Sequence, residues 1–202
     1  MARTNVQTNG FRYWGSLLGE NIVPRVVPKQ VASAYGTAIF KGDPVKKVSD
    51  GTVSISAAGE AIYGIVVGVH YLTTAGVYVD ANYVPASISY TPDRVRTIVD
   101  IIVATPFTIF EVSANAAVAD IATARTYVDE NVDHIATAAG NTGTGLGGYQ
   151  IAIAGHQTAT AQWRIHDISP SDSNDVTATN GRWLVIANET HNLAGTFSTT
   201  GI

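Results

Sequence analysis

The densest group of side chains that could bind a metal lies in the stretch YVDENVDH, which contains Asp129, Glu130, Asp133 and His134. Carboxylate and imidazole groups are common ligands of divalent cations, and on a helix those spaced by four residues would share one face. The apolar residues around them do not decide between helix and strand, and no second cluster completes a coordination sphere. We therefore interpret the stretch as a solvated acidic segment and expect no metal site; binding of a divalent cation is the alternative.

A glycine pattern of the nucleotide-binding type, G-x-G-x-x-G, occurs at Gly143, Gly145 and Gly148. In dinucleotide sites these glycines work because a helix follows and presents its first amide groups to the pyrophosphate. Here the alternating apolar residues Tyr149 and Ile151 follow, which is typical of a strand. The pattern therefore predicts a loop between two strands, and we expect no cofactor.

Nucleophilic catalysis requires a serine or similar group beside a histidine that a carboxylate orients. No serine lies in a G-x-S-x-G turn, and neighbours such as His166 and Asp167 point to opposite faces of a strand. The stretch SDSNDV lacks the glycine and distal glutamate of a calcium loop, so it is interpreted as a turn. The histidines that could act as the base are His70, His134, His156, His166 and His191. We expect no catalytic residue and no enzyme activity.

The elements that would position these groups are strands. The chain has 23 Val, 18 Ile and 23 Thr but only 6 Leu, and side chains branched at Cβ favour pleated sheets over helices. Asp50-Gly51 between two alternating segments predicts a tight hairpin. The apolar run 62–69 predicts a strand covered on both faces. Further strands are expected at 38–40, 45–48, 77–79, 95–104, 108–112, 149–153, 161–168 and 182–188.

One helix is expected over 114–126, with Asn115 as its N-cap and Val118 and Ile121 on one face. The fold class predicted is all-β: a barrel or sandwich with a jelly-roll-like or small-barrel core, one short helix and an extended N-terminal arm. Trp163 and Trp183 lie within apolar strands and are expected in the core.

Residues 1–30 show no regular period, and we interpret them as an extended arm. Its aromatic side chains either pack back onto the domain or contact a neighbouring subunit, so Phe11, Tyr13 and Trp14 are candidate partner-binding residues. Residues 31–202 are expected to form a single mainly-β domain. It comprises a barrel core at about 36–113 and C-terminal strands at about 149–190.

The composition argues against two classes of partner. Charged residues make up 14% of the chain and the net charge is −4, with basic residues scattered rather than clustered. Binding to nucleic acid or to an anionic membrane needs a basic patch, so neither is expected. There is no cysteine, no secretory signal and no apolar run of membrane-spanning length. A surface so poor in charge indicates contact with other chains.

The order of these segments resembles the capsid decoration proteins, or cement proteins, of tailed phages. GDPV followed by DGTVSISAAGEAIYGIVVGV resembles their small barrels. TPFTIFEVSANAAVADIA, AAGNTGTGLGGYQI and TAQWRIHDISPSDSNDVTATNGRWLVIANETH resemble the C-terminal part of cement proteins from marine and cyanobacterial podophages. The resemblance covers about residues 36–192 and departs at Gly147-Gly148, where Ser-Gly is expected, and after His191. Its final motif comprises Trp183, Leu184, Val185, Asn188 and His191.

This resemblance implies a structural virion protein that binds the outside of an icosahedral phage head and stabilises the shell. The implied partners are the phage major capsid protein and the chain itself, as a homotrimer. The implied location is the capsid exterior, after synthesis in the bacterial host cytoplasm. The alternative is a carbohydrate- or receptor-binding surface protein of a phage particle, for which Trp14 or the loop 80–92 would have to expose aromatic rings.

Overall fold

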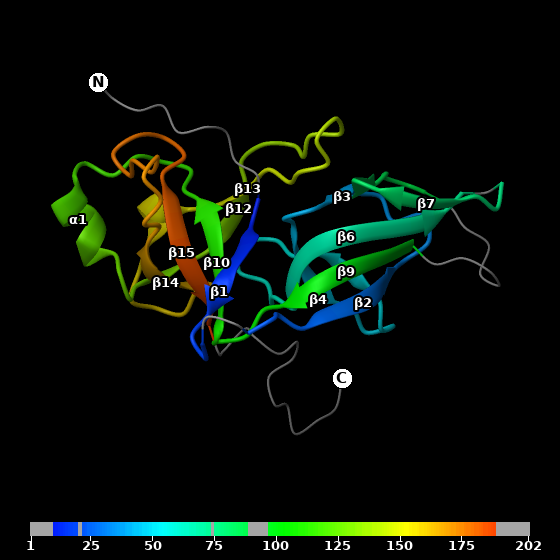
Figure 1. Cartoon of the computed structure of the whole chain (residues 1–202), viewed down its shortest axis with the longest axis horizontal. Coiled ribbons are helices and arrows are strands. Elements are labelled where there is room, and N and C mark those ends of the chain that lie inside the picture. The colour runs from blue at the N-terminus through cyan, green and yellow to red at the C-terminus, as the bar shows by residue number, and fades with distance from the viewer. Residues whose placement is uncertain (1–9, 20–21, 74, 89–96, 189–202) are drawn as a thin grey trace.

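A computed structural model describes residues 10–19, 22–73, 75–88 and 97–188 (Figure 1). The chain is mainly β, as predicted, and of the two core types considered it has the small barrel. Figure 1 shows two parts side by side, a barrel that carries β6 and β9 and a second sheet that carries β10, β14 and β15.

Five strands close the barrel. They follow the order β4-β5-β2-β9-β6, and β6 pairs with β4 again through Pro44 and Ile65. Neighbouring strands are antiparallel except β2 and β5, and β7 extends the sheet beside β6. The barrel elements are β2 (Val26–Val31), β4 (Pro44–Lys47), β5 (Val53–Ile55), β6 (Gly64–Leu72), β7 (Tyr78–Ala81) and β9 (Thr97–Val103).

The second part is a five-stranded antiparallel sheet in the order β1-β10-β15-β14-β11. It contains β1 (Arg12–Ser16), β10 (Thr108–Ser113), β11 (Asn131–Val132), β14 (Trp163–Ile168) and β15 (Arg182–Ala187). Smaller elements complete the described chain: β3 (Ile39–Phe40) with β8 (Tyr83–Val84), β12 (His134–Ala136) with β13 (Tyr149–Ile151), α1 (Ile121–Thr126) and a 3-10 turn (Ile153–Gly155).

The hairpin predicted at Asp50-Gly51 is confirmed. Lys47 pairs with Val53, and the amide of Thr52 donates to the Asp50 carboxylate over 2.9 Å. Gly51 has a φ of 86°, a left-handed conformation that glycine adopts without strain.

Strands β6 and β9 are covered on both faces, as the apolar run 62–69 predicts. Ile65 and Ile102 face a large cluster shared with the second sheet, whereas Val66 and Ile101 face the barrel interior. Successive side chains on a strand alternate between faces, so two strands serve both cores. This shared layer joins the two parts of the molecule.

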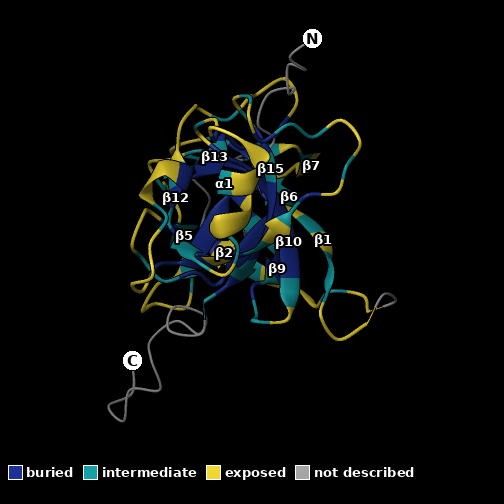
Figure 2. Cartoon of the chain, turned by 90° about the vertical axis from the view of Figure 1, so that its left-hand side faces the viewer, coloured by how far each residue is buried: buried dark blue, intermediate teal, exposed yellow. Residues whose placement is uncertain are grey.

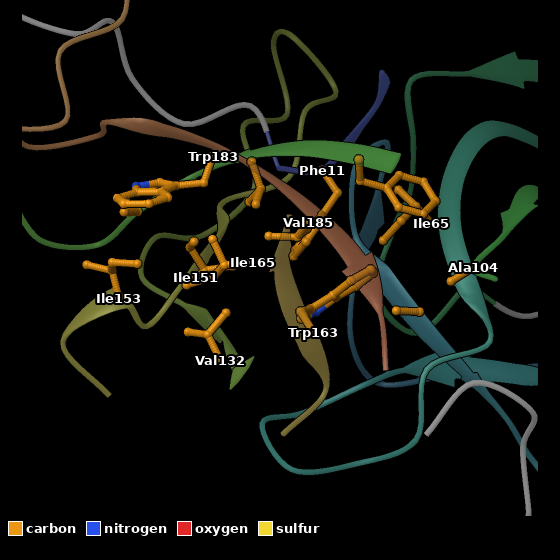
Figure 3. Close-up of a cluster of buried hydrophobic side chains, with 14 of the residues drawn as sticks. Phe11, Ile65, Ala104, Val132, Ile151, Ile153, Trp163, Ile165, Trp183 and Val185 are labelled. Carbon is orange, nitrogen blue, oxygen red and sulfur yellow. The ribbon is translucent and has the colours of Figure 1, made fainter. Parts of the chain in front are cut away.

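The tryptophans lie in the core, as expected. Trp163 and Trp183 are fully buried in the larger cluster with Val185 (Figure 3). Figure 3 also shows that Phe11, Ile65 and Ala104 reach this cluster from elements far apart in the sequence.

The helix is shorter than predicted. It spans Ile121–Thr126, and its N-cap is Asp120, whose carboxylate accepts the Thr123 amide over 2.7 Å. Asn115 instead accepts the amide of Ile153 through its side chain, so the prediction that it caps the helix is wrong. The reason is tertiary: Asn115 is held against β13 by backbone pairing of its own amide with Ile151.

The N-terminal segment is extended, but it contributes a strand to each of the two sheets and an exposed loop between them. β1 pairs with β10, and β2 is a barrel strand that pairs with β9 along its whole length. The second of these strands, β2, was not predicted from the sequence, because Pro28 has no backbone N–H to donate to a neighbouring strand. The proline is tolerated here because β2 meets β5 only through Val31 and Val53. β10, within the predicted barrel core 36–113, belongs to the second sheet.

Candidate functional site

The three aromatic residues proposed for partner binding lie in different environments. Phe11 is 2% exposed, stacks on Trp163 with ring centroids 4.7 Å apart, and donates its amide to Gly42 over 2.9 Å. Of the two alternatives for this ring, packing back onto the domain is the one observed. Its side chain therefore contributes to folding rather than to an exposed surface.

Tyr13 and Trp14 lie on β1, nearer the surface. The Tyr13 hydroxyl donates to the Ile22 carbonyl over 2.8 Å, which ties β1 to the segment that follows it. The pairing of β1 with β10 shifts between Tyr13 and Gly15, so Trp14 is the extra residue of a β-bulge. At this bulge Trp14 is 40% exposed.

An apolar surface follows Trp14 on the connection between β1 and β2. The Leu17 amide donates to the Phe107 carbonyl over 2.9 Å, which brings the β9–β10 turn beside this connection. Figure 2 shows the described part of the β1–β2 connection as an exposed loop that extends away from the body. Val23 is 85% exposed and Leu18 62%. We define the β1–β2 loop surface as Leu17, Leu18, Ile22, Val23, Val26 and Phe107.

This surface was not predicted from the sequence, although one local pattern marks it. Leu17-Leu18 is the only Leu-Leu pair in a chain with 6 Leu, and it lies in an aperiodic, glycine-bounded segment. Exposed apolar residues in a loop gain little for folding, so these residues are candidates for contact with a partner.

The acidic stretch YVDENVDH does not converge on one point. Asp129 pairs with Arg164, Glu130 pairs with His156, and the Asp133 carboxylate accepts the Gln162 amide. Across the described part of the chain, no group of three or more His, Asp or Glu side chains is arranged to hold a metal.

The fourth member of that stretch, His134, is fully buried between the two parts of the molecule. Its Nε2 lies 2.8 Å from the Ser56 carbonyl, and its Nδ1 accepts the Trp163 indole N–H over 3.1 Å. Burial lowers the pKa of His134 to about 4, a shift that the Ser56 hydrogen bond only partly opposes. Gln162 adds a bond from Nε2 to the Ala57 carbonyl over 2.8 Å. This hydrogen-bonded junction fixes the barrel to the second sheet.

His70 forms the clearest charged cluster on the surface. Its Nε2 lies 2.8 Å from Asp100, its Nδ1 contacts Asp80, and its ring stacks on the exposed Tyr78. The hydrogen bond to Asp100 and then that to Asp80 raise the pKa of His70, so the ring is favoured as an imidazolium. Because its two nitrogens point to opposite sides, the carboxylates cannot join the ring around one metal ion.

The glycine pattern lies in a loop, as predicted, between β12 and β13. Its Leu146 forms an isolated bridge with Lys41 in the connection between β3 and β4, and a strand rather than a helix follows. The SDSNDV stretch is a turn, in which Asp175 accepts the amide and hydroxyl of Thr177.

Comparison with protein-family models, with curated proteins and with solved structures found no match to this chain. Among the helices that the structure describes, none has the length and apolar character required to cross a membrane.

Proposed function

We propose that this chain is a capsid decoration protein that binds the outer surface of an icosahedral phage head and stabilises the major capsid protein shell. The observation that carries the proposal is the β1–β2 loop surface. It presents exposed apolar side chains from a loop that is anchored at both ends in sheets, at β1 and at β2.

A protein that braces a capsid needs attachment to a rigid fold and a surface that a partner can cover. A brace must transmit force between subunits, and hydrogen bonds tie described parts of this loop to their surroundings: the Leu17 amide donates to the Phe107 carbonyl, and the Tyr13 hydroxyl of β1 donates to the Ile22 carbonyl. Apolar side chains such as Leu18 and Val23 gain free energy when a partner covers them, at about 25 cal/mol per Å² of apolar surface. The low fraction of charged residues, 14%, favours such burial. The resemblance to cement proteins supports the same function.

The experiment measures binding of the purified chain to shells assembled from the major capsid protein encoded in the same genome. Leu18→Ser and Val23→Ser together remove apolar area without touching either core. We expect at least a tenfold weaker Kd, because two central contacts are worth about 1–2 kcal/mol or more.

The matched control is Val77→Ser, which changes an exposed valine, 58% exposed, on the β6–β7 turn of the barrel. It should bind shells like the unaltered chain. Equal affinity of the double variant and the control would exclude the β1–β2 loop surface as the contact, and failure of the unaltered chain to bind shells would exclude the function.

Self-association as a homotrimer is part of the same proposal. The low charge and the resemblance support it, and closed threefold symmetry would match the threefold positions of an icosahedral lattice. Sedimentation equilibrium tests it, and a monomer at all concentrations both in solution and on shells would exclude it.

The second candidate is binding of host carbohydrate or a receptor. Two exposed rings favour it, Trp14 and Tyr78, and the latter lies against the His70 cluster, which offers hydrogen-bonding groups beside an aromatic face. Binding of host-cell polysaccharide that Trp14→Ala or Tyr78→Ala abolishes would support this candidate; absence of binding would exclude it.

A further inference from the structure

The loop between β12 and β13 contacts the connection between β3 and β4 at one end of the barrel part. We call residues 140–148 the strap. The Lys41 amide donates to the Gly145 carbonyl over 3.0 Å, and the Gly147 amide donates to the Lys41 carbonyl over 2.8 Å. A side chain at Gly145 would collide with Asn82. Figure 1 shows this loop extending from β12 and β13 toward the barrel side.

A buried carboxyl group lies directly beneath the strap. Asp43 is 2% exposed, and its Oδ2 accepts the Phe40 amide over 2.8 Å. Its Oδ1 is buried and has no hydrogen-bond partner among the described residues. A Cβ atom on Gly147 would lie only 2.0 Å from Oδ1, so the strap backbone closes directly over this oxygen. Oδ1 has almost no solvent-accessible surface, so bulk water does not reach it while the strap is in place.

An ionised carboxylate is unfavourable in this position. Burial removes its hydration, and a single amide does not replace the lost water. Burial accordingly raises the pKa of Asp43 to about 7, against the smaller opposing effect of the Phe40 hydrogen bond. The titratable group that interacts with it from the strap side is Tyr149 on β13. Burial, with the charge of Asp43 as the next cause, raises the Tyr149 pKa to about 12, so this hydroxyl stays neutral near pH 7.

We propose that Asp43 is a proton-controlled latch: the strap is docked on the barrel when Asp43 is protonated and is released when Asp43 ionises. Release lets water reach Oδ1 and breaks the two hydrogen bonds to Lys41. The device is independent of the function proposed above, because it rests on contacts within the chain.

Proton linkage determines whether a rise in pH favours the docked or the released state of the strap. In the docked state Asp43 has a pKa of about 7, and in the released state its pKa approaches the ordinary value of 3.8. The docked state therefore binds the proton more tightly and is favoured at low pH. As pH rises between these two values, the opening equilibrium increases by up to about tenfold per pH unit; above about pH 7 it is constant.

The test uses NMR of the full chain. The ¹³C carboxyl shift of Asp43 gives its pKa, and amide hydrogen exchange, corrected for intrinsic rates, gives the opening equilibrium at Lys41 and Gly147. We expect a pKa near 7 and at least a tenfold loss of protection at these amides between pH 5 and pH 7.5. A pKa near 4, or protection that does not change with pH, would overturn the latch.

Two variants and one control separate the latch from general pH effects. Asp43→Asn should abolish the pH dependence of protection at Lys41 and Gly147. Gly147→Ala should release the strap at both pH values and lower the Asp43 pKa toward 3.8. Asp50→Asn alters an exposed aspartate in the β4–β5 turn, beyond the other end of β4, and should leave the pH dependence intact. If Asp43→Asn does not fold, the unaltered chain and Gly147→Ala decide the result; an unchanged Asp43 pKa in Gly147→Ala contradicts the proposal.

Discussion

The indole N–H of Trp163 donates a hydrogen bond to Nδ1 of His134, with 3.1 Å between the two nitrogens. On the other side of the ring, Nε2 of His134 lies 2.8 Å from the carbonyl oxygen of Ser56. Because the carbonyl can only accept, Nε2 must carry the hydrogen, and the imidazole is held as the neutral Nε2–H tautomer. A single side chain thereby links a strand of the second sheet to a loop of the barrel.

Substitution of each of the two buried tryptophans measures how much this hydrogen bond contributes to the free energy of unfolding. Trp163→Phe removes the donor to His134 and leaves a buried acceptor unpaired, whereas Trp183→Phe removes a buried N–H with no partner among the described residues. Both replacements lose similar volume. We expect Trp163→Phe to lower the free energy of unfolding by about 1–3 kcal/mol more than Trp183→Phe. Urea unfolding followed by circular dichroism measures the difference, and equal losses would show that the hydrogen bond contributes nothing.

Asp43 and His134 should give opposite pH dependences of stability. The raised Asp43 pKa means that the folded chain holds this proton more tightly, so stability falls as pH rises from 3.8 to about 7. The lowered His134 pKa means that the unfolded chain takes up a proton first, so stability falls as pH drops from 6.5 to about 4. Each effect has a limit of about 1.4 kcal/mol per pH unit, and between pH 4 and 6.5 they partly cancel.

Single substitutions separate the effect of Asp43 on the pH dependence of stability from that of His134. The stability of Asp43→Asn relative to the unaltered chain should increase as pH rises from 4 to 7. That of His134→Gln relative to the unaltered chain should increase as pH falls from 6.5 to 4. Denaturant midpoints at half-unit pH intervals measure both. Two differences that change in the same direction with pH would contradict the assignment of opposite shifts.

Phe11 and Trp14 provide a matched pair of aromatic truncations. Phe11→Ala should destabilise the chain by about 3–5 kcal/mol, because it leaves a cavity against Trp163 in the core. Trp14→Ala, at a bulge where the residue is 40% exposed, should cost less, about 1–2 kcal/mol, because it removes less buried apolar surface. Thermal and urea unfolding compare them. By the same reasoning, removal of residues 2–28 should unfold the chain, since it deletes β1 and half of β2.

Loss of the helix N-cap should have a smaller effect on stability, confined to the helix. Asp120→Ala should cost about 1 kcal/mol, because the Thr123 amide loses its acceptor. Hydrogen exchange at Thr123 and Ala124 should accelerate, while exchange in β6 should not. Asp167→Ala, which alters an exposed aspartate on β14, serves as the control. Unchanged exchange in Asp120→Ala would show that the cap is dispensable.

Local patterns were sufficient for much of the fold. Asp50-Gly51 specifies its own hairpin, because the turn geometry depends on two adjacent residues. The apolar run 62–69 implied a strand covered on both faces, since no polar side chain interrupts it. The excess of branched side chains implied sheets throughout. For the candidate site the sequence revealed less: it drew attention to Trp14, but not to the loop that follows it.

Tertiary structure decided the features that depend on distant partners. Asn115 and Asp120 are both good capping residues, and only the pairing of residue 115 with β13 selects Asp120. Phe11 resembles an arm residue until the position of Trp163 is known. The composition of the strap matches any flexible loop, yet the carboxyl group of Asp43, about a hundred positions earlier, lies directly beneath Gly147. Sequence determines which residues can form strands, turns and caps, because those preferences are local; which buried groups meet depends on how the two sheets pack.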